Sequence, residues 1–96
     1  MRRGGWVYIM TNRRRGKLYT GMTAFLALRV HQHRTGVGAE YCTKHAINML
    51  VHAEHFDDIV FAIRREKAIK AWRREWKLRL IEGANPDWLD LPLPIE

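Results

Sequence analysis

Two short runs near the N-terminus have the composition of paired strands. Residues 6–11 (WVYIMT) and 17–20 (KLYT) are rich in aromatic and β-branched side chains, and the polar turn between them ends at Gly16. Strand formers on both sides of such a turn are typical of a β-hairpin. Each run contains a tyrosine, Tyr8 and Tyr19, with ten residues between them. Strand packing alone accounts for both tyrosines, so the hairpin by itself does not decide whether they form a chemical site.

The next apolar positions recur at helical spacing. Gly21 closes the second strand, and Thr23 is the expected N-cap of a helix over residues 24–34. A loop follows this helix as far as the third strand. Arg29 and His33 are four residues apart and therefore share one face of the helix. That face either is exposed and basic or points over the sheet toward the tyrosines.

A third strand is predicted over residues 47–56 (INMLVHAEHF). By period two, one face of this strand carries Ile47, Met49, Val51 and Ala53. The opposite face also carries an apolar residue, Leu50. Because both faces are apolar, we expect this strand to be central, with cover on each side.

A long helical region is predicted after the acidic pair at 57–58, which suits the positive end of a helix dipole. Between 59 and 81 the apolar stripe drifts by a quarter-turn or more. One straight helix cannot bury both sets of residues on a flat sheet. The drift therefore predicts two helices, or a marked kink, with the change near 70–72.

The tail from Gly83 contains three prolines and is expected to be extended, with Trp88 and Leu91 anchoring it to the body. The order of elements is then β-β-α-β-α-α. The predicted fold class is α/β, of the α+β type, with a small, three-stranded, mainly antiparallel sheet flanked by helices. We expect one domain over residues 1–96.

Composition suggests a compartment and a class of partner. A hydrophobic fraction of 47% with four tryptophans is typical of a folded chain. A single cysteine, Cys42, excludes an intrachain disulfide, and no apolar stretch is long enough for a secretory or membrane segment. We therefore expect a cytoplasmic protein that does not contact membranes. The formal net charge of +7 favours a polyanionic partner, most often nucleic acid.

The basic residues gather in two segments. The hairpin turn carries Arg13, Arg14, Arg15 and Lys17. Eight of the seventeen Lys and Arg residues lie between Arg64 and Arg79, among them Lys67 and Lys70. A solvated helical face explains the second segment taken alone. Taken together, the two segments predict one phosphate-contacting surface, whose affinity for nucleic acid falls steeply with salt.

One acidic residue interrupts the second basic segment. Helical angles place Glu66 close to Ile59 and Ile63, on the covered side of the helix and not toward solvent. Two explanations remain open for such a carboxylate. It is held either in a structural ion pair with a neighbouring basic residue or as a ligand for a hard cation such as Mg²⁺.

Taken in this order, these residues resemble the GIY-YIG nuclease family. Trp6-Val7-Tyr8 stands at the first motif and Tyr19-Thr20-Gly21 at the second, with the family's usual separation of the tyrosines. The segment GMTAFLALRVHQH resembles the helix that follows, with Arg29 at the functional arginine and His33 at a histidine found in some branches. REKAIK places Glu66 at the metal-binding glutamate. The resemblance covers nearly the whole chain and is strongest to small stand-alone members, which are similar to the nuclease domain found in excinuclease ABC.

The resemblance implies a metal-dependent endonuclease that hydrolyses phosphodiester bonds in nucleic acid, with DNA favoured over RNA. It implies low or structure-directed specificity and a role in DNA repair or recombination. The implied catalytic residues are Tyr8, Tyr19, Arg29 and His33, and Glu66 would bind Mg²⁺ or Mn²⁺.

One departure from the family pattern leaves a second function open. Leu78 stands where many members carry an asparagine, and Asn85 follows several residues later. The alternative function is a non-catalytic, basic nucleic-acid-binding module. Metal-dependent cleavage of DNA distinguishes the two.

Overall fold

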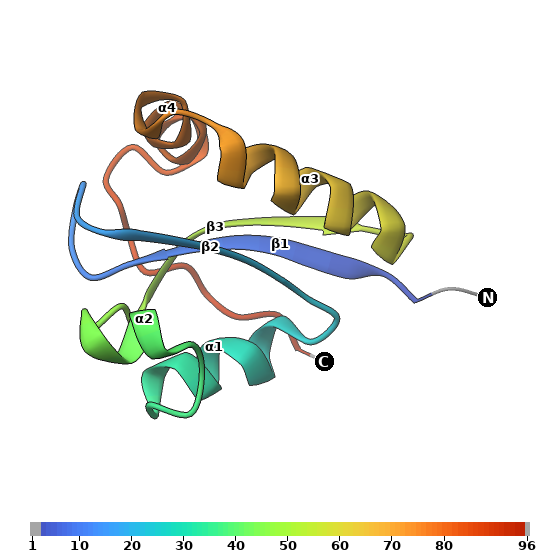
Figure 1. Ribbon diagram of the computed structural model, residues 1–96, viewed down its shortest axis with the longest axis horizontal. Helices are drawn as coiled ribbons and strands as arrows, with labels where there is room; N and C mark the ends of the chain where they lie inside the picture. Colours follow the sequence, from blue (N-terminus) through green and yellow to red (C-terminus); the bar gives the residue numbers. More distant parts are fainter. Residues whose placement is uncertain (1–2, 96) are drawn as a thin grey trace.

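Three antiparallel strands form the sheet, in the spatial order β2-β1-β3. The computed structural model describes residues 3–95, and its strands are β1 (Gly5–Thr11), β2 (Leu18–Thr23) and β3 (Met49–Phe56). Helices cover both faces of this sheet (Figure 1). The predicted fold class, a three-stranded antiparallel sheet flanked by helices, is confirmed.

The central strand is β1, so the prediction that the third strand would be central is wrong. Residues 7–10 of β1 are all at most 1% exposed. β3 lies at an edge, and the C-terminal tail covers that edge. The backbone N–H of Leu91 donates to the carbonyl of Leu50 at 2.8 Å, and the Asp90 carboxylate accepts from the Leu50 N–H at 2.9 Å. The tail thus supplies the cover that the two-sided apolar pattern of β3 requires.

A β-bulge interrupts the alternation predicted for β3. Ile9 pairs with His52 whereas Met10 pairs with Leu50, so Val51 is the extra residue. An extra residue resets the period of two. Val51 consequently packs in the core on one face of the sheet, whereas Ala53, predicted on the same face, packs in the core on the other.

Two helical layers sandwich the sheet. On one face lie α1 (Leu26–Arg34) and α2 (Glu40–Lys44), and on the other lie α3 (Ile59–Ala71) and α4 (Arg74–Ala84) (Figure 1). The short helix α2 lies within a segment predicted to be a loop. Alternate residues of β1 divide between two cores, with Val7 and Ile9 on the α3 side and Tyr8 and Met10 on the α1 side.

The first helix begins two residues later than predicted. Gly21 lies inside β2 and does not close it, and the strand continues to Thr23. The Thr23 hydroxyl accepts a hydrogen bond from the backbone N–H of Phe25 at 3.1 Å, so it forms a local turn instead of capping the helix. The helix then starts at Leu26 with no side-chain cap.

The break between the last two helices is confirmed. α3 ends at Ala71, Trp72 has extended backbone angles, and α4 starts at Arg74. At the start of α3, the Asp58 side chain accepts from the Val60 N–H at 2.9 Å, as expected for an acidic N-cap. The break lets Ile69 and Ile81 both reach the same core.

The C-terminal tail is anchored as predicted. Trp88 is 2% exposed and packs in the core on the α3 side, whereas Leu91 packs in the core on the α1 side. The tail therefore passes around the β3 edge from one layer to the other.

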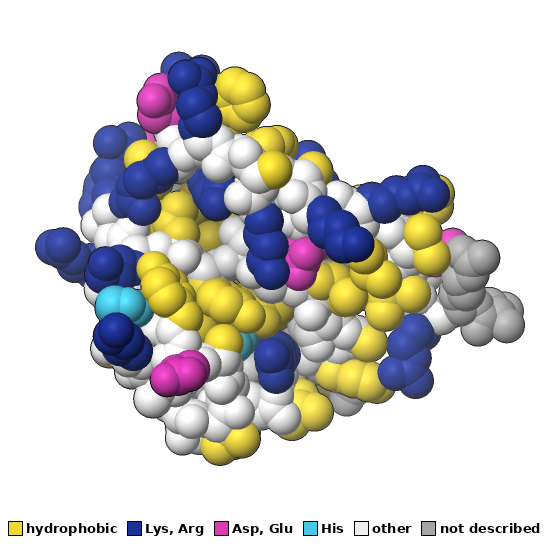
Figure 2. All heavy atoms as spheres, in the orientation of Figure 1, with side chains coloured by type: hydrophobic (Ala, Val, Ile, Leu, Met, Phe, Trp, Pro, Cys, Tyr) yellow, Lys and Arg dark blue, Asp and Glu magenta, His cyan; other side chains and the backbone are white. Residues whose placement is uncertain are grey.

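Within residues 3–95, no helix is long and apolar enough to cross a lipid bilayer. Figure 2 shows Lys and Arg side chains spread over the α3–α4 layer and over the end of the sheet at which the β1–β2 turn lies, with few acidic side chains between them. Both basic segments identified in the sequence therefore contribute cations to this side of the molecule.

Candidate active site

The site is centred on Tyr8, which crosses over a glycine in the neighbouring strand. Tyr8 pairs with Gly21 across β1 and β2. A Cβ added at Gly21 would lie 2.4 Å from the Tyr8 hydroxyl oxygen and 2.5 Å from the ring carbon that bears it. Gly21 is therefore needed for the close approach of the tyrosine ring, and not for an unusual backbone angle.

Four of the predicted catalytic residues meet on the α1 side of the sheet, and we call them the tyrosine cluster: Tyr8, Tyr19, Arg29 and His33. The Tyr8 hydroxyl lies 2.9 Å from Nε2 of His33. The Arg29 guanidinium interacts with the hydroxyls of both tyrosines, and its Nη1 donates to Oε1 of Gln32 at 3.1 Å. Ring centroids are 6.3 Å apart for Tyr8 and Tyr19 and 5.2 Å apart for Tyr19 and His33. The predicted shared face of Arg29 and His33 thus points at the tyrosines and not at solvent.

Burial keeps the inner part of this cluster neutral. It raises the pKa of Tyr8 to about 12, although the hydrogen bond from Arg29 opposes the rise. Burial, and then the charge of Arg29, lower the pKa of His33 below its usual value. The Tyr8 hydroxyl thus interacts with Arg29 and is hydrogen-bonded to Nε2 of His33, so these three side chains form one connected group.

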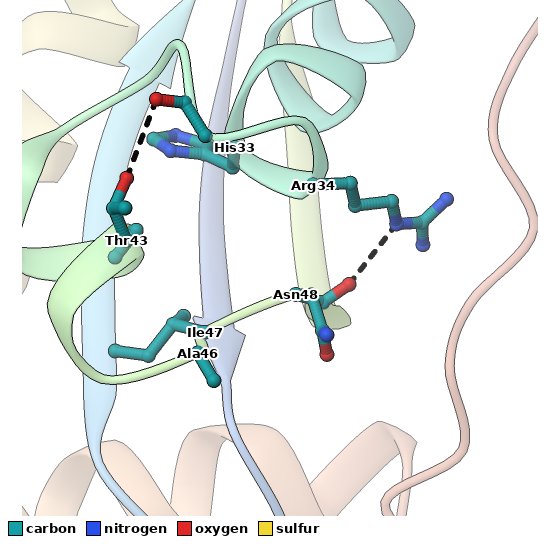
Figure 3. A pocket seen from close by; sticks show the side chains of 8 residues that line it. His33, Arg34, Thr43, Ala46, Ile47 and Asn48 are labelled. Carbon is teal, nitrogen blue, oxygen red and sulfur yellow. Dashed lines mark hydrogen bonds between the residues drawn. The ribbon is translucent and has the colours of Figure 1, made fainter.

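A second glycine and a small hollow lie behind His33. Nδ1 of His33 is buried and has no hydrogen-bond partner, and a Cβ added at Gly38 would lie 2.4 Å from it. The hollow has a volume of about 200 Å³, and Thr43, Ile47 and other residues of the α2 region line it together with His33 (Figure 3). The Nδ1 side of the His33 ring thus faces residues 38–47, which follow α1 in the chain.

Helix α2 adds two aromatic side chains that the sequence analysis did not identify. The rings of Tyr19 and Tyr41 stack with centroids 6.4 Å apart and planes 28° apart, and His45 lies 4.6 Å beyond Tyr41. The sequence did contain a signal for this pair of rings. Glu40 is an acidic residue suited to the first turn of a helix, and Tyr41 and His45 follow it with the i, i+4 spacing that places two side chains on one helical face.

Glu66 lies on α3, in the layer on the opposite face of the sheet from Arg29. Its side chain is 19% exposed, and its Oε2 lies 3.3 Å from Nζ of Lys70, one helical turn away. Within residues 3–95, no hydrogen bond or ion pair joins Glu66 to the tyrosine cluster. Of the two explanations that the sequence left open for Glu66, the ion pair is thus present, and it is partly exposed to solvent. The helix that carries Glu66, α3, packs against both β1 and the edge strand β2.

The donor set at Glu66 fits a Mg²⁺ ion. No group of three His, Cys, Asp or Glu side chains in the described part of the chain could hold a metal ion. Mg²⁺ commonly binds through one or two carboxylates and fills the rest of its shell with water and phosphate oxygens. A single accessible carboxylate such as Glu66 suits that chemistry, and Lys70 is a competing partner that the ion would displace.

The basic residues of the β1–β2 turn differ in whether another side chain of the protein already binds them. Arg13, Arg14 and Lys17 are exposed, as are Lys67 and Lys70 on α3. Arg15, in contrast, binds the Glu82 carboxylate of α4 through two hydrogen bonds of 2.6 and 2.8 Å. This pairing, with a further hydrogen bond from Trp88, lowers the pKa of Glu82 to about 2. Arg15 therefore attaches the turn to α4.

Asn85 has a structural role. It is 5% exposed, and its side-chain amide donates to the carbonyls of Val51 and Leu89 and accepts from the Leu89 N–H. All these bonds connect the end of α4 to β3 and to the tail. These hydrogen bonds account for the burial of Asn85 through its contacts with β3 and the tail.

Comparison with known proteins agrees with this geometry. Residues 4–79 match the profile of the GIY-YIG catalytic domain. The chain is 43% identical over 65 residues to a UPF0213 protein of Haloquadratum walsbyi, covering 68% of this chain and 73% of the relative. Identity to a UPF0213 protein of Staphylococcus haemolyticus is 40% over 65 residues, covering 68% of this chain and 79% of the relative.

A solved structure is also similar. The solution NMR structure of a UPF0213 protein from Bacillus halodurans has a TM-score of 0.57 and 28% sequence identity, covering 91% of this chain and 92% of that one. GIY-YIG domains are typically endonucleases and generally use divalent metal ions. Since the profile spans most of the chain and includes both tyrosines, Arg29 and Glu66, the chain belongs to the GIY-YIG family of nucleases.

Proposed function

We propose that this protein is a Mg²⁺- or Mn²⁺-dependent endonuclease that hydrolyses phosphodiester bonds in DNA. The tyrosine cluster is the observation that supports this most strongly, because it brings a partly exposed guanidinium, Arg29, together with a partly exposed phenol, Tyr19. Nothing in the cluster selects a base sequence, so we expect low or structure-directed specificity. Such an activity suits DNA repair or recombination, and the single, buried Cys42 suits a reducing, cytoplasmic compartment.

Charge supports nucleic acid as the substrate. The chain carries a net +7, and Arg13, Arg14 and Lys17 on the β1–β2 turn are exposed together with Lys67 and Lys70 on α3. Exposed cations on two segments of the chain can bind successive phosphates of a strand. The same contacts would hold RNA, so the preference for DNA is part of the proposal and is tested with it.

Arg29 and Tyr19 are the residues that we assign to the reacting phosphate. Arg29 is partly exposed, and a guanidinium can bind two oxygens of a phosphate at once. Tyr19 is also partly exposed, whereas Tyr8 is 1% exposed. We therefore assign Tyr19 to orient the attacking water, and Tyr8 and His33 to position Arg29 through their hydrogen bonds.

Glu66 is the residue that would hold the metal ion. When bound there, a divalent ion supplies positive charge to the phosphate and to the leaving oxygen. The protein's own contribution is a carboxylate fixed on α3, close to the cations Lys67 and Lys70 of the same helix.

A cleavage assay tests this proposal. Purified protein is incubated with branched, nicked and single-stranded DNA and with RNA of the same sequence, with Mg²⁺, Mn²⁺ or EDTA. We expect metal-dependent cleavage of DNA, and a loss of about 10²–10³-fold in Arg29→Ala, Tyr19→Phe and Glu66→Gln. Glu75→Gln removes an exposed carboxylate from α4 and is the matched control, with activity unchanged.

The contrary outcomes are distinct. If the three variants cleave as well as the wild type, the cluster and Glu66 are not the active site. If DNA is bound but stays intact with either metal ion, the protein is a non-catalytic nucleic-acid-binding module. If RNA is cut in preference to DNA, the proposed substrate is wrong.

A further inference from the structure

A basic hollow lies next to the tyrosine cluster, where β2, α2 and α4 meet. Its volume is about 280 Å³, and Lys17, Leu18, Tyr41, Arg74 and Lys77 line it. These residues come from three elements that are far apart in the sequence. The hollow adjoins the site directly, because the Tyr41 ring on its wall stacks on Tyr19.

All the charged residues that line this hollow are positive. Lys17, Arg74 and Lys77 contribute three cations, and within the described residues none of them forms an ion pair with a carboxylate. Like charges that share a small space repel one another, so their assembly costs free energy unless an anion is bound. The neighbouring His45 is subject to the same field, since burial and the charges of Lys17 and Lys44 lower its pKa.

The fold holds these cations in place through neutral groups. Arg74 donates to the backbone carbonyls of Arg15 and Gly16 at 2.5 and 2.7 Å, which fixes α4 against the β1–β2 turn. Nζ of Lys77 lies 3.5 Å from the carbonyl of Lys70. The ion pair between Arg15 and Glu82 completes the attachment of the turn. These contacts orient the cations without neutralising them.

We propose that this hollow binds a phosphate of the nucleic-acid strand other than the one that is cut. Lys17, Arg74 and Lys77 bind the phosphate oxygens, and Tyr41 forms the aromatic wall between this phosphate and Tyr19. The inference rests on the proposed function, and it adds a fixed contact for the strand beside the active site. A second phosphate held there sets the direction in which the strand crosses Arg29.

Neutral phosphate analogues test the assignment without any cleavage. Fluorescent single strands of roughly 12 nucleotides each carry one methylphosphonate at a different position, and binding is measured by anisotropy in EDTA. We expect one methylphosphonate position to weaken wild-type binding by roughly two- to fivefold, as for one exposed charge contact. In the double variant Lys17→Gln/Lys77→Gln, which leaves Arg74 as the one cation of these three, the same analogue should have a much smaller effect.

Salt dependence gives an independent measurement. The slope of log affinity against log salt should decrease by up to about 0.7 in Lys17→Gln/Lys77→Gln, as expected when one phosphate of a single strand is no longer held. Arg3→Gln is the matched control, because Arg3 is exposed, lies over the Phe25 ring and belongs to neither basic segment. Its slope and its methylphosphonate pattern should match those of the wild type, apart from a uniform change in affinity.

The possible results separate this inference from the proposed function. If Lys17→Gln/Lys77→Gln responds to every analogue as the wild type does, the phosphate site is overturned, whatever the cleavage assay shows. If the analogue effect is lost in Lys17→Gln/Lys77→Gln but the wild type cuts no DNA, the phosphate site stands and the nuclease proposal fails. If no strand binds at low salt, both are overturned.

Discussion

At the scale of single residues, the site depends on how closely two strands approach each other. The Tyr8 ring occupies the space in which any side chain at position 21 would lie. The Tyr8 hydroxyl there lies beside both Arg29 and His33. Burial raises the pKa of Tyr8, so the hydroxyl stays protonated. The glycine of the second motif is thus explained by packing, and the tyrosines are explained by hydrogen bonding to Arg29.

Substitution of Gly21 tests this packing. We expect Gly21→Ala to lower the free energy of unfolding by about 1–3 kcal/mol, because the buried ring of Tyr8 has to move. It should also reduce cleavage, since a displaced Tyr8 no longer holds Arg29. Urea denaturation and the cleavage assay measure the two effects.

Gly83→Ala is the matched control for that substitution. Gly83 lies within α4, and a Cβ there would meet no atom within 4 Å. Alanine is the better helix former, so this variant should be more stable than the wild type by about 0.5–1 kcal/mol. Equal stability losses in both variants would show that the contact between Tyr8 and Gly21 is not the cause.

At the scale of elements, the C-terminal tail completes the sheet. It covers the β3 edge through Leu91 and Asp90 and then reaches the core on the α1 side. The tail begins at Asn85, where α4 ends. The side-chain amide of Asn85 donates a hydrogen bond to the buried carbonyl of Val51, the extra residue of the β-bulge. An edge strand with apolar residues on both faces depends on such cover.

Removal of the Asn85 amide should affect stability and not chemistry. In Asn85→Ala the Val51 carbonyl loses its side-chain donor, and we expect a loss of about 1–3 kcal/mol in the free energy of unfolding. Asn48→Ala, at an exposed position, should change stability by less than about 0.5 kcal/mol. The cleavage rate of Asn85→Ala, measured well below its unfolding temperature, should equal that of the wild type. A large rate loss in a folded variant would instead give Asn85 the role of the family's asparagine.

At the scale of the whole molecule, the distribution of charge decides which cations can meet a substrate. The net charge of +7 is spread over the turn and both helices of the α3–α4 layer. Arg15, however, is bound to Glu82, whereas Arg13 and Arg14 beside it are exposed. We therefore propose Arg13 and Arg14 as the phosphate ligands of this turn.

The salt dependence of binding distinguishes these arginines. The double variant Arg13→Gln/Arg14→Gln should decrease the slope of log affinity against log salt by about 1.4 on single-stranded DNA, which corresponds to two phosphates. Arg15→Gln should leave the slope unchanged, because its guanidinium is already occupied by Glu82. A decrease of similar size in Arg15→Gln would mean that the arginine leaves Glu82 to bind DNA.

The sequence by itself determined the elements and the identity of the chemical groups. Local rules were sufficient for the hairpin, for the start of α3 after the acidic pair at 57–58 and for the break near Trp72, because each depends on neighbouring residues. The spacing of the tyrosines and the residues that follow them was sufficient for the family, since that resemblance depends on order along the chain.

Only the tertiary structure decided which strand is central, where β3 changes face and which cations are free. β1 is central because it pairs with both β2 and β3, and the tail covers the β3 edge; no local pattern contains either of these long-range contacts. Arg15 is occupied because the fold brings Glu82 to it from 67 positions away. The basic hollow likewise exists only where β2, α2 and α4 meet, since its cations come from distant segments. Contacts of this kind depend on how the layers pack, and periodicity along the chain does not record them.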